Sequence, residues 1–131
     1  MSQYLDLVKN YLLELDIKII EENEKEKLIV VEDEENGIRN LVIDCEPPIL
    51  VLEQLILEVR KDDGDFFKRL LQMNRTLVHG AFVLDEEAKF VFFRDTLQIE
   101  SLDLNELEAS IHSLSLALAE YGAELLEYAK K

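Results

Sequence analysis

The period of the apolar residues changes twice along this 131-residue chain, and this change constrains the fold more than any other feature. Near both ends the apolar residues recur every three or four positions, which is the spacing of one helical face. From about residue 17 to residue 45, apolar and polar residues alternate instead, as they do in half-buried strands. The helical stripes are Leu5, Val8, Leu12 and Leu15, and then Leu104, Leu107, Ile111, Leu114, Leu118, Tyr121, Leu125 and Tyr128.

This pattern predicts an α+β fold in which an antiparallel sheet of five or six strands is flanked by three helices, mainly on one side. The alternating segment predicts a three-stranded meander, with runs at 17–19, 28–31 and 41–45. Asn36-Gly37 is a strong hairpin signal between the second and third runs, because both residues tolerate positive φ. Pro47-Pro48 ends the third strand, since neither residue can donate a hydrogen bond to a neighbouring strand.

Two further helices and two further strands are predicted around an ambiguous segment. Ser2 can cap a first helix that runs to about Leu15, and Asp65 can cap a second helix that runs to about Asn74. Strands are expected at 77–84 and 89–94. Both faces of the second of these are apolar, so it should be central or covered on both sides. The segment Ile49 to Val59 fits a helix or a strand, and its periodicity does not decide between them.

The last helix is the clearest predicted element. Asp103 and Glu106 stand in capping-box spacing just before its apolar stripe. It should run for about 27 residues, or about 40 Å. Such a stripe is compatible with a coiled-coil seam, but we expect the helix to lie across the sheet, because the apolar face of the sheet needs a cover.

Length and composition indicate a single domain over residues 1–131 with no linker. The formal net charge is −15, from 14 basic and 29 acidic residues. A chain this acidic is repelled by phosphate backbones and anionic lipids, so we expect neither a nucleic-acid nor a membrane partner. No apolar run exceeds four residues, which predicts no transmembrane helix and no signal peptide. With its single cysteine, the chain is expected in the cytoplasm.

The residue types that carry chemistry are sparse and badly spaced. The four glycines are isolated, so no phosphate-binding loop is present. His79 and His112 lack metal-ligand spacing, and Cys45 fits a strand better than a nucleophilic site. The acidic runs at 21–26 and 32–35 lack the spaced ligands of a calcium loop. The sequence therefore predicts no catalytic residue, no cofactor and no metal, and a protein that is not an enzyme.

A family resemblance emerges from the second half of the chain. A helix ends in Leu-Leu-x-x-Asn at Leu70 to Asn74, a small residue enters the strand His79 to Leu84, an aromatic strand follows at Phe90 to Phe93, and Leu102 to Leu107 opens the last helix. In this order the chain resembles the type III secretion chaperone-like fold, and within it the bacterial YbjN family. The resemblance implies that residues 50–59 form a strand, and that the protein is small, acidic, cytosolic and dimeric.

Two hypotheses about function follow. The first is a non-enzymatic, chaperone-like or regulatory protein that holds an extended or apolar segment of a protein partner along grooves and sheet edges. The second is a small-ligand-binding domain or an enzyme that uses buried carboxylates, which would need a closed pocket and shifted pKa values. The sequence identifies neither the partner nor the ligand.

The second helix also predicts a homodimer. Phe66 and Leu70 share one face of this helix, Phe67 and Leu71 share another, and the two faces point about 100° apart. A helix in a small domain normally buries one stripe. The other pair would then be free to meet a second copy, so these four residues form the predicted dimer or partner surface.

Overall fold

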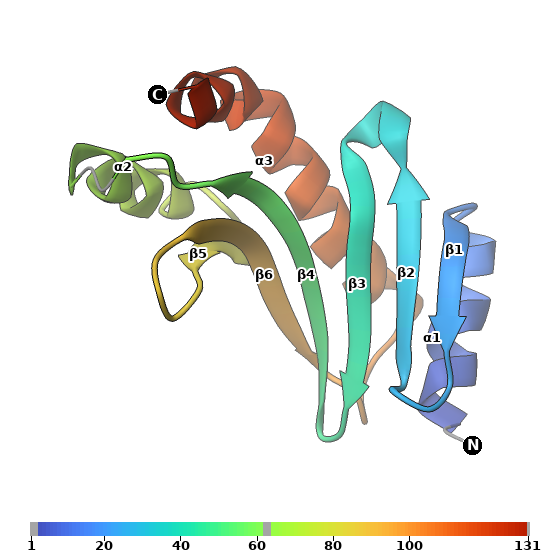
Figure 1. Ribbon diagram of the computed structural model, residues 1–131. Helices are drawn as coiled ribbons and strands as arrows, with labels where there is room; N and C mark the ends of the chain where they lie inside the picture. The colour runs from blue at the N-terminus through green and yellow to red at the C-terminus, as the bar shows by residue number, and fades with distance from the viewer. Residues whose placement is uncertain (1–2, 62–63, 131) are drawn as a thin grey trace.

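The computed structural model describes residues 3–61 and 64–130. In this part of the chain three α-helices pack against one six-stranded antiparallel sheet (Figure 1), which confirms the predicted fold class. Ser2, the predicted cap of the first helix, lies outside the described residues. The elements in chain order are α1 (Gln3–Glu14), β1 (Lys18–Asn23), β2 (Leu28–Asp33), the 3₁₀ turn η1 (Glu34–Asn36), β3 (Ile38–Glu46), β4 (Ile49–Glu58), α2 (Gly64–Asn74), β5 (Ala81–Leu84), β6 (Phe90–Gln98) and α3 (Leu104–Lys130).

The strand order in the sheet is β1-β2-β3-β4-β6-β5, and every neighbouring pair is antiparallel. The predicted meander is confirmed as β1 to β3, and the ambiguous segment is the strand β4, as the family resemblance implied. Glu53, a charged residue within this strand, lies opposite Arg94 of β6, and its Oε2 is 3.4 Å from Arg94 Nη1. Gly37 follows η1 with a φ of 78°, the left-handed geometry expected at Asn36-Gly37.

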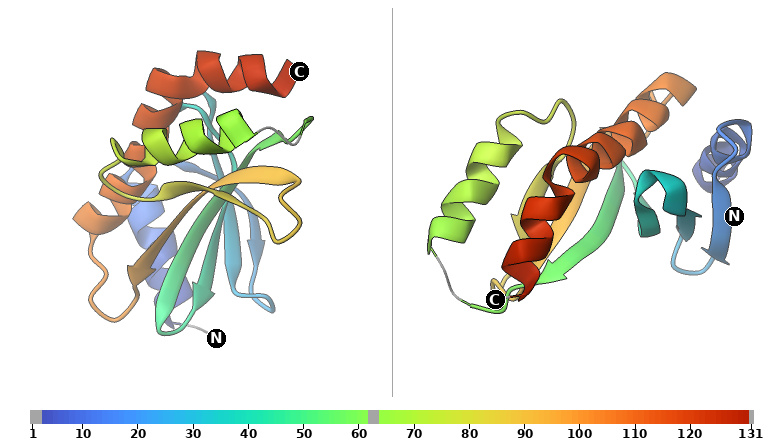
Figure 2. Two further views of the ribbon diagram at one scale, coloured as in Figure 1. Left: turned by 90° about the vertical axis from the view of Figure 1, so that its left-hand side faces the viewer. Right: turned by 90° about the horizontal axis from the view of Figure 1, so that it is seen from above.

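The helices lie on one side of the curved sheet (Figure 2). The strand residues that face them are almost fully buried: Ile29, Val31, Leu41, Ile43, Leu50, Leu52, Val91 and Phe93. α3 crosses this face, and its stripe from Leu107 to Leu125 packs into the same core. Burying such an aliphatic side chain contributes about 1.5–3 kcal/mol, so the sheet favours the helix as its cover over a separate coiled coil. Asp103 caps α3, since its Oδ1 accepts the N–H of Glu106 at 2.8 Å.

Three predicted boundaries were wrong. α2 begins at Gly64, which places Asp65 in its first turn and not before it. The strand predicted at 77–84 is only Ala81–Leu84, because the N–H groups of Thr76 and Leu77 bond back to the end of α2 and Gly80 has a φ of 74°. The strand predicted at 89–94 runs to Gln98, because its last residues pair with the start of β4. The end of α1 at Glu14 agrees with the predicted end at about Leu15.

Candidate functional site

The two edges of the sheet differ in how their backbone groups are occupied. At the β5 edge, the N–H of Phe82 donates to Asn74 Oδ1 at 2.7 Å, and Asn74 Nδ2 donates to the carbonyl of Phe82 at 3.0 Å. The amide of Asn74, the last residue of α2, therefore takes the place that a neighbouring strand would occupy. This edge is closed to further pairing at its centre.

The opposite edge is formed by β1, which pairs with β2 alone among the described strands. Its register shifts between Ile19 and Glu21, which marks a β-bulge, and the exposed Lys18 and Glu22 add charge. Bulges and charged side chains keep an edge from pairing indiscriminately. In the described chain, however, no side-chain amide brackets the backbone of β1 as Asn74 brackets that of Phe82. The bulge and the charges therefore discourage indiscriminate pairing, but the backbone of β1 remains available to a partner strand.

A groove of about 450 Å³ lies between α1 and this edge. Its apolar lining comes from Leu13, which is 63% exposed, and from the half-buried Ile17 and Ile19. An ion pair spans the groove, with Lys9 Nζ at 3.0 Å from Glu22 Oε1. The hydrogen bond to Glu22 raises the pKa of Lys9, yet both side chains remain well exposed, so the pair is weak and easily displaced. We call this feature the α1–β1 groove.

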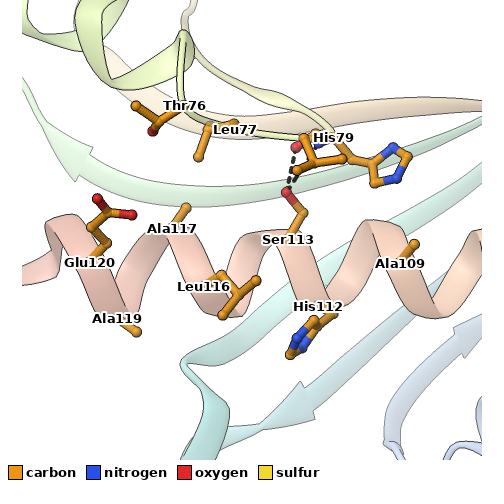
Figure 3. Close-up of a pocket in the computed structure, with 11 residues that line it drawn as sticks. Thr76, Leu77, His79, Ala109, His112, Ser113, Leu116, Ala117, Ala119 and Glu120 are labelled. Atoms are coloured by element: carbon orange, nitrogen blue, oxygen red, sulfur yellow. Dashed lines mark hydrogen bonds between the residues drawn. The ribbon is translucent and has the colours of Figure 1, made fainter.

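A second hollow, of about 570 Å³, lies between α3 and the loop Thr76–His79 that connects α2 to β5 (Figure 3). Ser113 and Ala117 point from α3 toward this loop, whereas His112 points to the other side of the helix. Ser113 Oγ donates to the carbonyl of His79 at 2.7 Å, which fixes the loop to the helix. The remaining lining is mostly apolar, and we call this feature the α3–loop hollow.

The structure separates the four residues of the predicted dimer surface. Phe66 and Leu70 are 3% and 4% exposed and lie in the core of the same chain, where Phe66 stacks on Tyr128 with ring centroids 4.3 Å apart. Phe67 is half-buried beside that core, and Leu71 is 72% exposed. A partner surface on α2 is therefore reduced to Phe67 and Leu71.

The residues considered for chemistry lie apart from one another. Burial raises the pKa of the Cys45 thiol to about 11, so the reactive thiolate is scarce at neutral pH. His79 lies in the loop before β5 and not in a strand as predicted, and both it and His112 are exposed. Burial and the neighbouring Glu46 raise the pKa of Asp44, but Asp44 lines none of the hollows described above.

Two negative findings apply to the described residues. Among them, no three His, Cys, Asp or Glu side chains are placed to hold a metal ion together. No helix in residues 3–61 or 64–130 combines the length and apolar character that crossing a membrane requires.

Sequence reasoning did not single out Leu13, Leu116 or the role of Asn74. Leu13 and Leu116 lie beside the apolar stripes of their helices, and each is more than half exposed. An apolar residue one step off a stripe is the signal that could have found them. Asn74 was noted as part of a motif, but its contact with Phe82 depends on how α2 docks beside the sheet edge.

Comparisons with known proteins agree with this fold. A sequence model of the CesT_Tir_1 family matches residues 1–131. No protein with a curated description matches the sequence. The chain is similar to YbjN from E. coli, with a TM-score of 0.69 and 16% sequence identity, and the match covers 92% of each chain.

Two chaperone structures are similar as well. The type III secretion chaperone SycH of Yersinia pestis, solved with a stable fragment of YscM2, matches with a TM-score of 0.62 and 18% identity over 89% of this chain and 98% of that one. The HopA1–SchA chaperone–effector complex gives a TM-score of 0.61 and 16% identity over 98% and 94%. At these identities the likeness concerns the fold.

Proposed function

Because this chain belongs to the CesT_Tir_1 family, a type III chaperone family, we propose that it is a non-enzymatic, chaperone-like protein that holds an extended segment of a protein partner at the β1 edge. The observation that carries the proposal is the asymmetry of the sheet. Asn74 occupies the centre of the β5 edge, whereas no described strand covers the outer side of β1, which lies next to an apolar groove.

Strand addition explains how the α1–β1 groove would work. A partner segment pairs its backbone with β1, and every second side chain of that segment points toward α1. One apolar side chain would then cover Leu13, Ile17 and Ile19, while the Lys9–Glu22 pair opens or moves to the rim. The bulge between Ile19 and Glu21 limits regular pairing to a short stretch, which favours a specific partner over general aggregation.

The enzyme alternative has weaker support. The hollows are open grooves, and the two groups with burial-raised pKa values, Asp44 and Cys45, do not converge on one of them. The function that we propose therefore involves no catalytic residue and no cofactor. The acidic surface and the lone, buried Cys45 also suit work in the bacterial cytoplasm, without nucleic acid or lipid as a partner.

We also propose a homodimer through α2. Leu71 is 72% exposed and Phe67 is half-buried, so a two-fold pairing of this helix would cover apolar surface that the single chain leaves open. Light scattering at about 0.15 M salt tests this, because self-repulsion of a −15 chain is screened beyond about 8 Å there. Leu71→Asp should convert a dimer to a monomer with unchanged circular dichroism. A wild-type mass of one chain across micromolar concentrations would end this proposal.

The chaperone proposal is tested by affinity purification from cells that encode the chain, followed by mass spectrometry and hydrogen exchange. Wild-type protein and Leu126→Asp, a control at a 56% exposed position on α3, should retain the same partner, whereas Leu13→Asp should lose it. In the complex, the amides of β1 should exchange more slowly. Equal retention by Leu13→Asp, together with unchanged exchange in β1, would contradict the proposal.

A further inference from the structure

The α3–loop hollow is a built feature of the fold. The hydroxyl of Thr76 lies 2.7 Å from the carbonyl of Met73 and 2.7 Å from the hydroxyl of Tyr121, and the carbonyl of His79 accepts the hydroxyl of Ser113. The loop is thus tied to α3 at two different positions along the helix, Tyr121 and Ser113. Its walls stay in place without a ligand, which lowers the ordering cost of binding.

The lining of this hollow favours an apolar side chain. Ala109, Ser113 and Ala117 follow one another at four-residue spacing on α3, so the floor has little side-chain bulk. Leu116 and Val78 stand at the hollow and are 54% and 84% exposed. Exposed apolar side chains around a concavity mark an interaction site more often than scattered ones do.

A smaller hollow of about 300 Å³ lies on the other side of the same helix, between α3, η1 and the turn from α1 to β1. His112 lines both hollows and so forms the ridge between them. The smaller hollow holds the carboxylates of Asp33 and Glu108, and none of its described lining residues is Lys or Arg. Asp33 Oδ2 accepts the amide of Asn36 at 2.8 Å, which orients this carboxylate. The charge of this hollow suits a cation.

We propose that the two hollows form one docking surface, which adjoins the α1–β1 groove at Ile17 but is otherwise lined by different residues, for a segment of another protein that carries an apolar side chain close to a lysine or arginine. The apolar side chain enters the α3–loop hollow beside Leu116, and the cationic side chain reaches across His112 to Asp33 and Glu108. The charge of −15 attracts such a segment from a distance, and the carboxylates then fix its register.

A random peptide library displayed on phage tests this surface. Selection is carried out on Leu13→Asp protein, so that binding does not depend on the α1–β1 groove and this proposal can fail independently of the chaperone proposal. Enriched peptides should pair an apolar residue with Lys or Arg. Synthetic copies should bind about 30-fold more weakly to Leu116→Asp, which removes an apolar anchor, and about 10-fold more weakly to Glu108→Lys.

Leu126→Asp is the matched control, since Leu126 lies on the same helix with 56% exposure and lines neither hollow. This variant should bind the peptides as the parent does, and circular dichroism should show that all variants are folded. Three results overturn the proposal: no enriched peptide, peptides without Lys or Arg, or equal weakening by Leu116→Asp and Leu126→Asp.

Discussion

Gly80 is the position where a single added methyl group should cost the most stability. Its φ is +74°, and a Cβ built there would lie 2.4 Å from Cζ and 2.8 Å from Cε1 of Phe93. Carbon atoms rest at about 3.5–4.0 Å from one another, so the ring would have to move by about 1 Å. Phe93 is 1% exposed and meets Phe82 edge-on at 6.1 Å, so that movement disturbs a packed core.

The expected loss of stability in Gly80→Ala has two parts. The left-handed backbone costs an alanine about 1 kcal/mol, and overpacking a core costs about 1–3 kcal/mol. Gly80→Ala should therefore lower the free energy of unfolding by about 2–4 kcal/mol, out of a total of about 5–15 kcal/mol for a typical domain. For a chain of this length that corresponds to a fall in Tm of about 10 °C.

Urea unfolding followed by circular dichroism measures this loss, and Gly122→Ala is the control. No heavy atom of the described chain lies within 4 Å of a Cβ built at Gly122, outside its own helix and nearest neighbours. Since Gly122 is inside α3, alanine there should raise stability by about 0.5–1 kcal/mol. Combining Gly80→Ala with Phe93→Leu removes the clashing ring atoms, so the double variant should lose at least 1 kcal/mol less than the two single losses added together. A Gly80→Ala protein within about 0.5 kcal/mol of the wild type would refute the reasoning.

Three further outcomes are expected. Asn74→Leu should lower the free energy of unfolding in urea by about 2 kcal/mol and promote aggregation, because the N–H and C=O of Phe82 lose their hydrogen-bond partners. An unchanged urea midpoint would contradict this. The hydrogen bond from Arg69 lowers the pKa of Glu124, so this carboxylate adds stability above its unfolded pKa that is lost as the pH falls through the folded one. Glu124→Gln should therefore reduce stability slightly near pH 7 and not near pH 2, and an equal loss at both pH values argues against the linkage. Cys45 should react with a thiol reagent at pH 8 only as fast as the protein unfolds, and complete labelling within seconds would count against its burial.

The sequence could predict those elements whose apolar periodicity is compatible with only one type of secondary structure. The stripe of α3 demands a partner surface, and the alternating segment supplies one, so the layer arrangement follows from burial alone. The capping of α3 by Asp103 is equally local, because donor and acceptor are three residues apart. Periodicity left β4 undecided, and there the family resemblance was needed.

The surface features depend on contacts between distant segments, which a pattern does not contain. Leu77 and Val78 extend an apolar run, yet the backbone of Leu77 bonds back to Asn74 and the run leaves the sheet. The Phe66 face of α2, and not the Phe67 face, turns to the core, where Phe66 stacks on Tyr128 near the end of α3. Leu12 is buried and its neighbour Leu13 is exposed, because the way α1 packs beside β1 decides which side of the helix faces the core.

The asymmetry of the two sheet edges also bears on how such a molecule could polymerise. Growth of a sheet from chain to chain needs two free edges on each copy, one to receive a neighbour and one to offer to the next. With Asn74 bonded to Phe82, the centre of the β5 edge is closed, and β1 is the edge that the described residues leave open. Two copies that pair through β1 join their sheets and leave no β1 edge open, so one continuous sheet stops growing at two chains. The same pairing would exclude a partner strand, which makes self-association through β1 a competitor of binding there.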